Sequence, residues 1–200
     1  TRLHGATAIV TGGVGGIGAA IVRRLVDEGA AVVILDLAGE SSAARAAELG
    51  AHFLPVDLAD PVDTRAAVAQ AVDLLGGVDV LVNCAGVFRL VPVLEITDAE
   101  WDRVMNINAR GTLTTMQAVA PVMIERGGGR IVNLASMAAK AGGAMEAHYA
   151  ASKSAVVALT RAAAIEWGGH GVTVNAICPG YVLTDMGAGT RTEEQVAQWT

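Results

Sequence analysis

A tyrosine and a lysine, Tyr149 and Lys153, lie four residues apart, and Ser136 precedes the tyrosine by thirteen residues. On a helix, side chains at i and i+4 project from the same face. A phenol beside an ammonium can exchange a proton with a substrate, while a serine hydroxyl holds the substrate oxygen. These three residue types could therefore carry out acid–base chemistry at an alcohol or a ketone.

The positive charge of Lys153 is large enough in its effect to lower the pKa of Tyr149 as far as this chemistry requires. A free tyrosine has a pKa of about 10, and lowering it to near neutrality takes roughly 4 kcal/mol. One positive charge about 4 Å away supplies a similar free energy at an effective dielectric constant near 20. We therefore expect Lys153 to lower the pKa of Tyr149. A tyrosine–lysine pair alone is more often a solvated helix pair, so the argument also needs Ser136 at the end of a strand.

A second candidate site is the glycine-rich string Thr11–Gly18, between an apolar run and a helical pattern. Such a turn can bring backbone close to the pyrophosphate of a dinucleotide, although an ordinary glycine-rich turn is the alternative. Asp36 follows some twenty residues later and could accept hydrogen bonds from the adenosine ribose. Asp57 could bind the adenine amino group or form a turn.

The charges around this string favour NAD over NADP. The carboxylate of Asp36 would repel a 2′-phosphate. No arginine or lysine lies within Thr11–Gly18 or directly after Asp36, and the nearest following cation is Arg45. We expect NAD to be the cofactor.

Short apolar runs alternate with helical patterns along the whole chain. Continuous runs rich in Val, Ile and Leu indicate parallel strands that are covered on both faces. The expected strands are residues 6–10, 31–36, 52–57, 78–85, 130–135 and 172–178, and the expected helices are residues 17–28, 42–49, 62–75, 98–125 and 148–167. The alternation predicts one α/β domain with a doubly wound, Rossmann-type parallel sheet in the order 3-2-1-4-5-6.

Helix start signals support several of these boundaries. Asp60 precedes Pro61, a favourable pair at a helix start. Thr97 and Glu100 have the spacing of a capping box. Thr192 and Gln195 have the same spacing, yet the chain ends at residue 200, so we expect that the chain is truncated before its last elements.

Composition restricts the partners and the location of the protein. The net charge is −6 and there is no run of cations, which argues against nucleic acid. No apolar run is long enough to cross a membrane, so we expect a soluble, cytoplasmic protein. Cys84 and Cys178 end strands that flank a third, too far apart for a disulfide, and are expected to be buried thiols. The four histidines lack zinc-ligand spacing, so no metal site is expected.

The motifs together resemble those of the short-chain dehydrogenase/reductases. The resemblance extends along the whole chain, and its elements keep the order and spacing of that family. The matching residues are Thr11–Gly18, Asp57, Asn83-Cys84-Ala85-Gly86, Asn108, Ser136, Tyr149 with Lys153, Asn175, and Pro179-Gly180 followed by Thr184.

The resemblance implies a role for each catalytic residue. Tyr149 would be the general acid/base, Lys153 would bind the nicotinamide ribose and lower the tyrosine pKa, and Ser136 would position the substrate. Asn108 would hold a water that links Lys153 to solvent, and Asn83 would brace the sheet. The implied cofactor contacts are Gly12, Val14, Gly15, Gly16, Ile17, Gly18, Asp36, Leu37, Asp57, Leu58, Asn83, Ala85, Gly86, Tyr149, Lys153, Pro179, Gly180, Val182 and Thr184.

Two features depart from the family pattern. Family members often have a second asparagine where Cys84 stands, and a small thiol should pack there without entering the chemistry. The family also continues with a further helix and a seventh strand. It usually forms tetramers, and the small side chains of helices 98–125 and 148–167 would suit a dimer or tetramer interface.

The expected function is hydride transfer between NAD(H) and a secondary alcohol or ketone, with a polyol, a hydroxy acid or a hydroxysteroid as substrate. A 3-oxoacyl-thioester reductase, a non-catalytic nucleotide-binding regulator, and an epimerase or dehydratase are the alternatives. We expect Arg89 in solvent and His148 at the rim of the pocket. The other candidate pocket residues are Phe88, Leu90, Met137, 144–147 and 181–186.

Overall fold

The structure, a computed structural model, describes residues 1–184 and residue 186. Its centre is one six-stranded sheet whose neighbouring strands all run parallel, in the order β3-β2-β1-β4-β5-β6. The strands are β1 (Thr7–Thr11), β2 (Ala31–Asp36), β3 (His52–Pro55), β4 (Val80–Asn83), β5 (Gly129–Leu134) and β6 (Val172–Ile177). The predicted doubly wound, Rossmann-type fold and its strand order are confirmed.

Helices separate the strands along the chain, as the alternating pattern predicts. The α-helices are α1 (Gly16–Asp27), α2 (Ser42–Glu48), α3 (Pro61–Leu75), α4 (Asp98–Val104), α5 (Gly111–Glu125), α6 (Ala138–Ala141) and α7 (Ala147–Trp167). Three further segments are the 3-10 helices η1 (Val93–Glu95) and η3 (Gly168–His170) and the π-helix η2 (Met105–Arg110).

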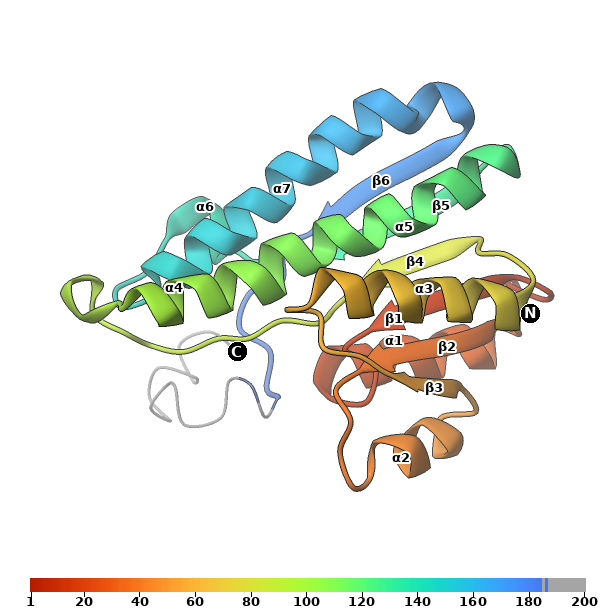
Figure 1. The fold of residues 1–200 in the computed structure, drawn as a ribbon, viewed down its shortest axis with the longest axis horizontal. Coiled ribbons are helices and arrows are strands. Elements are labelled where there is room, and N and C mark those ends of the chain that lie inside the picture. The colour runs from red at the N-terminus through yellow and green to blue at the C-terminus, as the bar shows by residue number, and fades with distance from the viewer. Residues whose placement is uncertain (185, 187–200) are drawn as a thin grey trace.

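The sheet separates two hydrophobic cores because successive strand residues point to opposite faces. Ile9 belongs to the core that contains Met116 of α5 and residues of α3 and α7. The next residue, Val10, belongs to the other core, with Val22 of α1 and Ala46 of α2. Figure 1 shows α3, α5 and α7 across the near face of the sheet, with α1 behind it.

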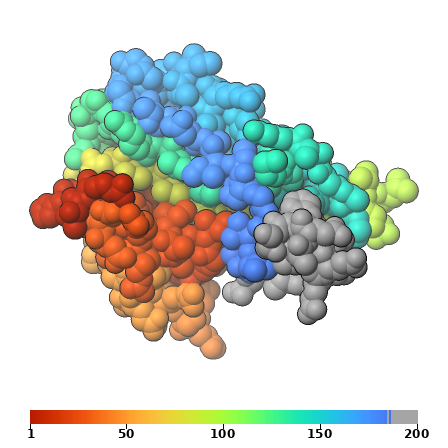
Figure 2. Space-filling model, turned by 180° about the vertical axis from the view of Figure 1, so that it is seen from behind, coloured from red at the N-terminus to blue at the C-terminus, as the bar shows by residue number. Residues whose placement is uncertain are grey.

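The reverse face is covered unevenly. Seen from behind, α1 and α2 (red to orange) cover the N-terminal part of the sheet, whereas β6 and residues 178–184 (blue) lie at the surface (Figure 2). Within the described residues β6 pairs with β5 alone, so its other edge has no partner strand.

The helix caps read from the sequence are present. The Asp60 side chain accepts hydrogen bonds from two backbone N–H groups of the first turn of α3. The Thr97 side chain accepts one from the N–H of Glu100 at the start of α4. These bonds satisfy donors that a helix leaves without an internal partner. The helix start expected at residues 192–195 lies outside the described residues.

The predicted single helix over residues 98–125 is wrong in its middle. The chain forms α4, then the π-helical turn η2, then α5, without a break in the helical path. A π-turn contains one residue more than an α-helical turn and recurs at functional sites. Hydrophobic periodicity cannot reveal it, because six residues are too few to change the apparent period of a helix this long. Asn108 lies within this turn.

The fourth strand is shorter than the predicted residues 78–85 and ends at Asn83. After Asn83, backbone N–H groups bind a side chain instead of the backbone of a neighbouring strand. The hydroxyl of Thr11 accepts hydrogen bonds from the N–H groups of Cys84 (3.1 Å) and Ala85 (3.2 Å). This contact turns the chain away from the sheet directly after β4. The third strand likewise ends earlier than predicted, at Pro55.

Both cysteines are free thiols, as predicted. They follow β4 and β6, and β5 lies between those strands. Each is partly exposed rather than fully buried, which corrects the expectation. Burial still raises the pKa of the Cys84 thiol to about 11, and the positive charge of Lys153 opposes this increase.

Candidate active site

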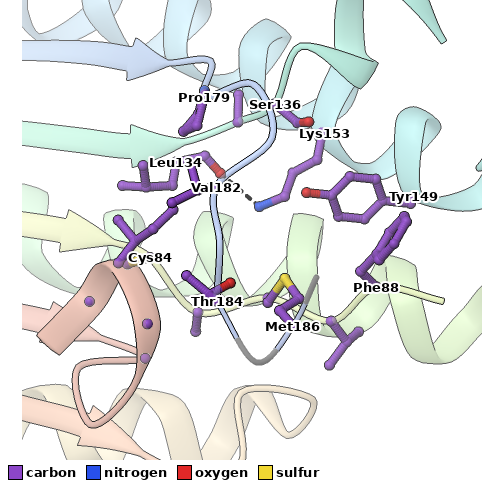
Figure 3. Close-up of a pocket in the computed structure, with 18 of the residues that line it drawn as sticks. Cys84, Phe88, Leu134, Ser136, Tyr149, Lys153, Pro179, Val182, Thr184 and Met186 are labelled. Atoms are coloured by element: carbon purple, nitrogen blue, oxygen red, sulfur yellow. Dashed lines mark hydrogen bonds between the residues drawn. The ribbon is translucent and has the colours of Figure 1, made fainter. Parts of the chain in front are cut away.

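A cavity of about 790 Å³ lies at the carboxyl ends of the strands. This edge collects the residues that follow β1, β2, β3, β4 and β5, because parallel strands all end on the same side. The cavity is lined by the glycine-rich turn, Asp36, Ser136, Tyr149 and Lys153, among others. The structure therefore brings the two halves of the predicted site into one space (Figure 3).

Nearly all residues predicted to contact the cofactor line this cavity. They are Gly12, Val14, Gly15, Gly16, Ile17, Gly18, Asp36, Leu37, Asp57, Leu58, Ala85, Gly86, Tyr149, Lys153, Pro179, Gly180, Val182 and Thr184. Two predicted residues, Asn83 and Asn108, lie behind the cavity wall, where their side chains are buried in hydrogen-bond networks.

The glycine-rich turn passes very close to the segment after β4. Gly12 has a φ of 66°, and a Cβ added there would lie 2.6 Å from the Cα of Ala85. Only glycine fits such an approach without strain. The N-cap of α1, Gly15, has no side-chain hydrogen bond to the first turn of the helix. An uncapped helix N-terminus at a cavity suits a phosphate group, so these residues fit a bound dinucleotide.

Asp36 joins the end of β2 to this turn. Its Oδ2 accepts a hydrogen bond from the N–H of Val14 (3.1 Å) and its Oδ1 from the N–H of Leu37 (2.9 Å). Asp57 also lines the cavity, but its Oδ1 accepts the N–H of Ala59 (2.9 Å) in a local turn. The two hydrogen bonds fix the orientation of the Asp36 carboxylate, the group predicted to contact the ribose. Asp57 forms the local turn that was the alternative to its predicted adenine contact.

Lys153 is almost fully buried, with 5% of its surface exposed. Its Nζ donates a hydrogen bond to the carbonyl oxygen of Leu134 at 2.7 Å, the dashed line in Figure 3. Burial lowers the pKa of this ammonium to about 8, because removal from water disfavours the charged form.

The phenol of Tyr149 points into the cavity near Lys153, with Phe88 packed edge-on against its ring at 4.8 Å. Burial raises the pKa of Tyr149 above its ordinary value, and a hydrogen bond with Ser136 opposes that increase. The sequence predicts that Lys153 lowers the pKa of Tyr149, but in the structure this pKa lies above its ordinary value. The Nζ of Lys153 lies 5.9 Å from the ring centre and is engaged by the Leu134 carbonyl, so desolvation of the phenol dominates.

Asn108 fastens the loop after β4 to α7. Its Oδ1 accepts the N–H of Val87 (2.8 Å), and its Nδ2 donates to the Val87 carbonyl and to Ser152 Oγ, each at 3.0 Å. Ser152 immediately precedes Lys153. The side chain thus acts as a clamp beside the buried ammonium, and its role towards a water molecule stays a prediction.

Asn83 belongs to a second buried network. Its Nδ2 donates to Asn133 Oδ1 on the neighbouring strand (2.9 Å), and its Oδ1 accepts from Thr115 on α5 (2.7 Å). Asn133 in turn donates to Thr160 on α7 (2.9 Å). These bonds tie the centre of the sheet to the two helices that pack over it. Asn83 thus contacts both the neighbouring strand and α5, and its role in bracing the sheet near the cofactor stays a prediction.

The prediction that His148 lies at the rim of the pocket is wrong. His148 is fully buried, and neither ring nitrogen has a hydrogen-bond partner among the described residues. Its Nε2 lies 3.6 Å from Oε1 of Glu100, which Arg103 also approaches at 3.5 Å. The helical period correctly predicts that His148 and Tyr149 point in different directions. It cannot show that α4 packs over His148 and buries it. Arg89 is exposed, as expected.

One wall of the cavity carries no strong signal in the sequence. The short helix α6 and the loop after it bring Met137, Ala141, Gly142, Gly143 and Glu146 to the cavity. The sequence predicts only Met137 and residues 144–147 of this segment as pocket residues. A four-residue helix of small side chains has no recognisable cap and is too short to show a period. The glycines shortly before Tyr149 are the one sequence signal that could have indicated a close-packed loop.

A family profile described as short chain dehydrogenase matches residues 6–195. The chain belongs to the short-chain dehydrogenase/reductase family. It is 45% identical over 184 residues to a sorbitol dehydrogenase of Cereibacter sphaeroides, covering 90% of this chain and 72% of that relative. It is 44% identical over 191 residues to a D-threitol dehydrogenase of Mycolicibacterium smegmatis, covering 93% and 74% respectively.

A solved structure agrees with this assignment. A short-chain type dehydrogenase/reductase from Mycobacterium ulcerans superposes with a TM-score of 0.94 at 30% identity, covering 100% of this chain and 76% of that one. As a member of this family, the protein is an oxidoreductase that uses a nicotinamide cofactor.

No described helix is both long and apolar enough to span a membrane. Within the same residues, no cluster of three or more His, Cys, Asp or Glu side chains is arranged to hold a metal ion.

Replacing Gly12 with alanine tests the close approach in this short-chain dehydrogenase. The added Cβ would meet the backbone of Ala85 in a left-handed conformation, so we expect Gly12→Ala to lower the free energy of unfolding by about 1–3 kcal/mol. Gly15→Ala is the matched control, since φ is −139° there and no atom lies within 4 Å of an added Cβ. Urea denaturation of both variants provides the measurement, and equal losses would contradict the prediction.

The buried ammonium predicts a pH dependence of stability. Lys153 has a pKa of about 8 when folded and about 10.5 when unfolded, so the unfolded chain binds this proton more tightly. The free energy of unfolding of the wild type, relative to Lys153→Met, should therefore rise by about 3 kcal/mol between pH 7 and pH 10.5. Urea denaturation across this range measures the difference. A difference that stays flat with pH would show that the ammonium is not destabilised by burial.

Proposed function

We propose that this protein is an NAD-dependent dehydrogenase of secondary alcohols of the polyol type, and that Tyr149 is its general acid/base. In the forward direction a CH–OH group becomes a ketone, and the reverse reaction reduces the ketone. The main support is the convergence of Tyr149, Ser136 and Lys153 on the cavity that the glycine-rich turn also lines. The relatives that oxidise sorbitol and D-threitol favour a polyol over the other secondary alcohols considered from the sequence.

The preference for NAD rests on the charges at the adenosine end of the cavity. Asp36 holds a carboxylate there, fixed by the N–H groups of Val14 and Leu37. Among the described residues that line the cavity, Lys153 is the single cation, and it lies at the other end beside Tyr149. A 2′-phosphate would thus meet a negative charge without a cation to neutralise it.

The proton steps follow from the phenol and its neighbours. In oxidation, the Tyr149 oxygen takes the proton of the substrate hydroxyl, while Ser136 Oγ holds the substrate oxygen by a hydrogen bond. In reduction, the phenol returns that proton to the ketone oxygen. When bound, the nicotinamide supplies the hydride acceptor or donor and, in its oxidised form, a positive charge beside the phenol.

Lys153 contributes through its charge and its position. With a pKa of about 8 it is mostly protonated at neutral pH. Burial raises the pKa of Tyr149, so a proton acceptor at this site needs all nearby positive charge and the hydrogen bond from Ser136. The support that the ammonium gives to proton transfer onto Tyr149 is consequently present at neutral pH and is lost as the pH rises through about 8.

The competing functions lack comparable support. A non-catalytic nucleotide-binding regulator has no need for a serine, a tyrosine and a lysine converging on one cavity. A 3-oxoacyl-thioester reductase that uses NADPH would need a cation near Asp36, and the described lining has none there. A cytoplasmic location and assembly into a dimer or tetramer stay predictions.

Replacing Tyr149 with phenylalanine tests the proton role. The variant keeps the ring and its edge-on contact with Phe88 but loses the titrating hydroxyl. We expect kcat to fall by about 10²–10⁴-fold, the usual contribution of general acid–base catalysis, while NADH affinity measured by fluorescence titration stays near that of the wild type. Turnover close to the wild type would rule out this role, and loss of NADH binding would point to misfolding instead.

Replacing Asp36 with asparagine tests the cofactor preference. The substitution removes the negative charge with little change in size, so we expect the ratio of kcat/KM with NAD to that with NADP to fall about tenfold or more. Asp27→Asn, at the exposed end of α1, removes one charge far from the cavity and should leave the ratio unchanged. An unaltered ratio in Asp36→Asn would count against the ribose contact.

A further inference from the structure

The ring of Tyr149 rests against a second aromatic ring. Phe88, which follows β4 and lines the cavity, packs edge-on against it, with the ring centres 4.8 Å apart and the ring planes at 72°. Aromatic pairs prefer this T-shaped arrangement to a face-to-face stack. Figure 3 shows the phenol oxygen on the side of Lys153 and Phe88 on the other side of the ring. Phe88 therefore backs the ring while the hydroxyl faces the reacting groups.

Phe88 is held in place by hydrogen bonds on both sides of it in the chain. The N–H of Val87 donates to Oδ1 of Asn108 (2.8 Å), and the Val87 carbonyl accepts from Nδ2 of the same side chain (3.0 Å). On the other side, the N–H of Val91 donates to the carbonyl of Met145 (2.8 Å), just before α7. Met145 has a φ of 65°, a conformation that costs free energy in a residue with a side chain and persists where its surroundings impose it. The loop that carries Phe88 thus has a fixed position.

The same asparagine also fixes the helical turn that carries Tyr149. Nδ2 of Asn108 donates to Oγ of Ser152 (3.0 Å), and Ser152 Oγ donates to the carbonyl oxygen of Tyr149 (2.7 Å). Asn108 and Ser152 are fully buried, so water does not compete for these bonds. The loop of Phe88 and the turn of Tyr149 are thus tied to one buried side chain, and the backbone sets the separation of the two rings.

The contacts at the hydroxyl end of Tyr149 cannot hold the ring throughout the reaction. The hydroxyl forms a hydrogen bond with Ser136, but in the proposed mechanism both groups turn to the substrate oxygen. The ammonium of Lys153 is bound to the Leu134 carbonyl and lies 5.9 Å from the ring centre. The contact with Phe88 involves the ring and leaves the hydroxyl free of it, so this contact persists when the substrate enters.

We propose that Phe88 is a positioning residue, which acts through Tyr149 by keeping the phenol aimed at the reacting oxygen. This inference rests on the proposed role of Tyr149 as general acid/base and adds the group that orients it. The loss of an edge-on aromatic pair corresponds to about a 2- to 10-fold change in how often a ring takes one orientation. Proton transfer needs that orientation, because the reacting atoms must be close and aligned. The expected effect therefore falls on kcat.

The test removes the ring of residue 88 and then restores it. Phe88→Leu keeps an apolar side chain without a flat edge, and Phe88→Tyr restores an aromatic ring. Phe88→Met, a more flexible apolar substitute, gives the same comparison where Phe88→Leu lowers the midpoint of thermal unfolding. Phe53→Leu is the matched control, because Phe53 is the other phenylalanine of the chain and lies in β3, outside the described lining of the cavity. Each protein is assayed with NAD on butan-2-ol, butane-2,3-diol and a hexitol, and its NADH affinity and unfolding midpoint are measured alongside.

For Phe88→Leu we expect kcat to fall about 2- to 10-fold, by the same factor for each alcohol, while NADH affinity and the unfolding midpoint stay near those of the wild type. Phe88→Tyr should recover most of kcat, and Phe53→Leu should leave kcat unchanged. The decisive comparison adds Phe88→Leu to Tyr149→Phe. A residue that acts through the phenol has no hydroxyl left to orient there, so the second substitution should cause no further loss of the residual activity.

The possible outcomes separate this inference from the proposed function. An unchanged kcat in a folded Phe88→Leu protein would overturn the inference alone. So would a loss in Phe88→Tyr as large as that in Phe88→Leu, or a change confined to KM that grows with the size of the alcohol, since Phe88 would then only be a wall of the substrate pocket. An equal loss in the wild-type and Tyr149→Phe backgrounds would make Phe88 a packing residue and would also overturn it. No turnover of these alcohols by the wild type with NAD or NADP, or near-normal turnover by Tyr149→Phe, would overturn the proposed function and this inference with it.

Discussion

The ammonium of Lys153 ends inside the protein at the carbonyl oxygen of Leu134, and this hydrogen bond forms only if α7 packs against the end of β5. A cation away from water is unfavourable unless its hydrogen bonds are made. The packing of α7 is therefore the constraint on which the site depends. Asn133, near the carboxyl end of β5, donates a hydrogen bond to Thr160 of α7, and Asn108 in the π-turn donates one to Ser152. With these contacts in place, Tyr149 and Lys153 have a fixed position relative to the sheet.

The cofactor half of the cavity is held by a separate set of contacts, all centred on β1. Thr11 turns the chain after β4, Gly12 lets that chain pass at close range, and Asp36 receives the N–H of Val14. The two halves meet because parallel strands end at a common edge. The same geometry explains why residues far apart in the sequence share one cavity.

The sequence was sufficient for the fold, since continuous apolar runs and helix caps such as Asp60 are local signals that the structure preserves. The resemblance to the short-chain dehydrogenase/reductases also indicated most of the cofactor-side residues that line the cavity. The sequence is insufficient where the deciding contact is long-range. The burial of His148 depends on α4, and the pKa of Tyr149 depends on how much water its neighbours exclude. The π-turn and α6 are too short for a periodic pattern to reveal.

The π-turn has a consequence for how this chain can vary. Because it contains one residue more than an α-turn, α4 and α5 are out of phase with each other by about 100° of helical rotation. Deleting any single residue between Met105 and Arg110 would restore a regular helix, yet it would rotate the surface of α4 that covers His148 relative to the surface of α5 that faces the sheet. Length is thus as constrained in this segment as residue identity, and insertions or deletions are better tolerated in the loops on either side of the long helix.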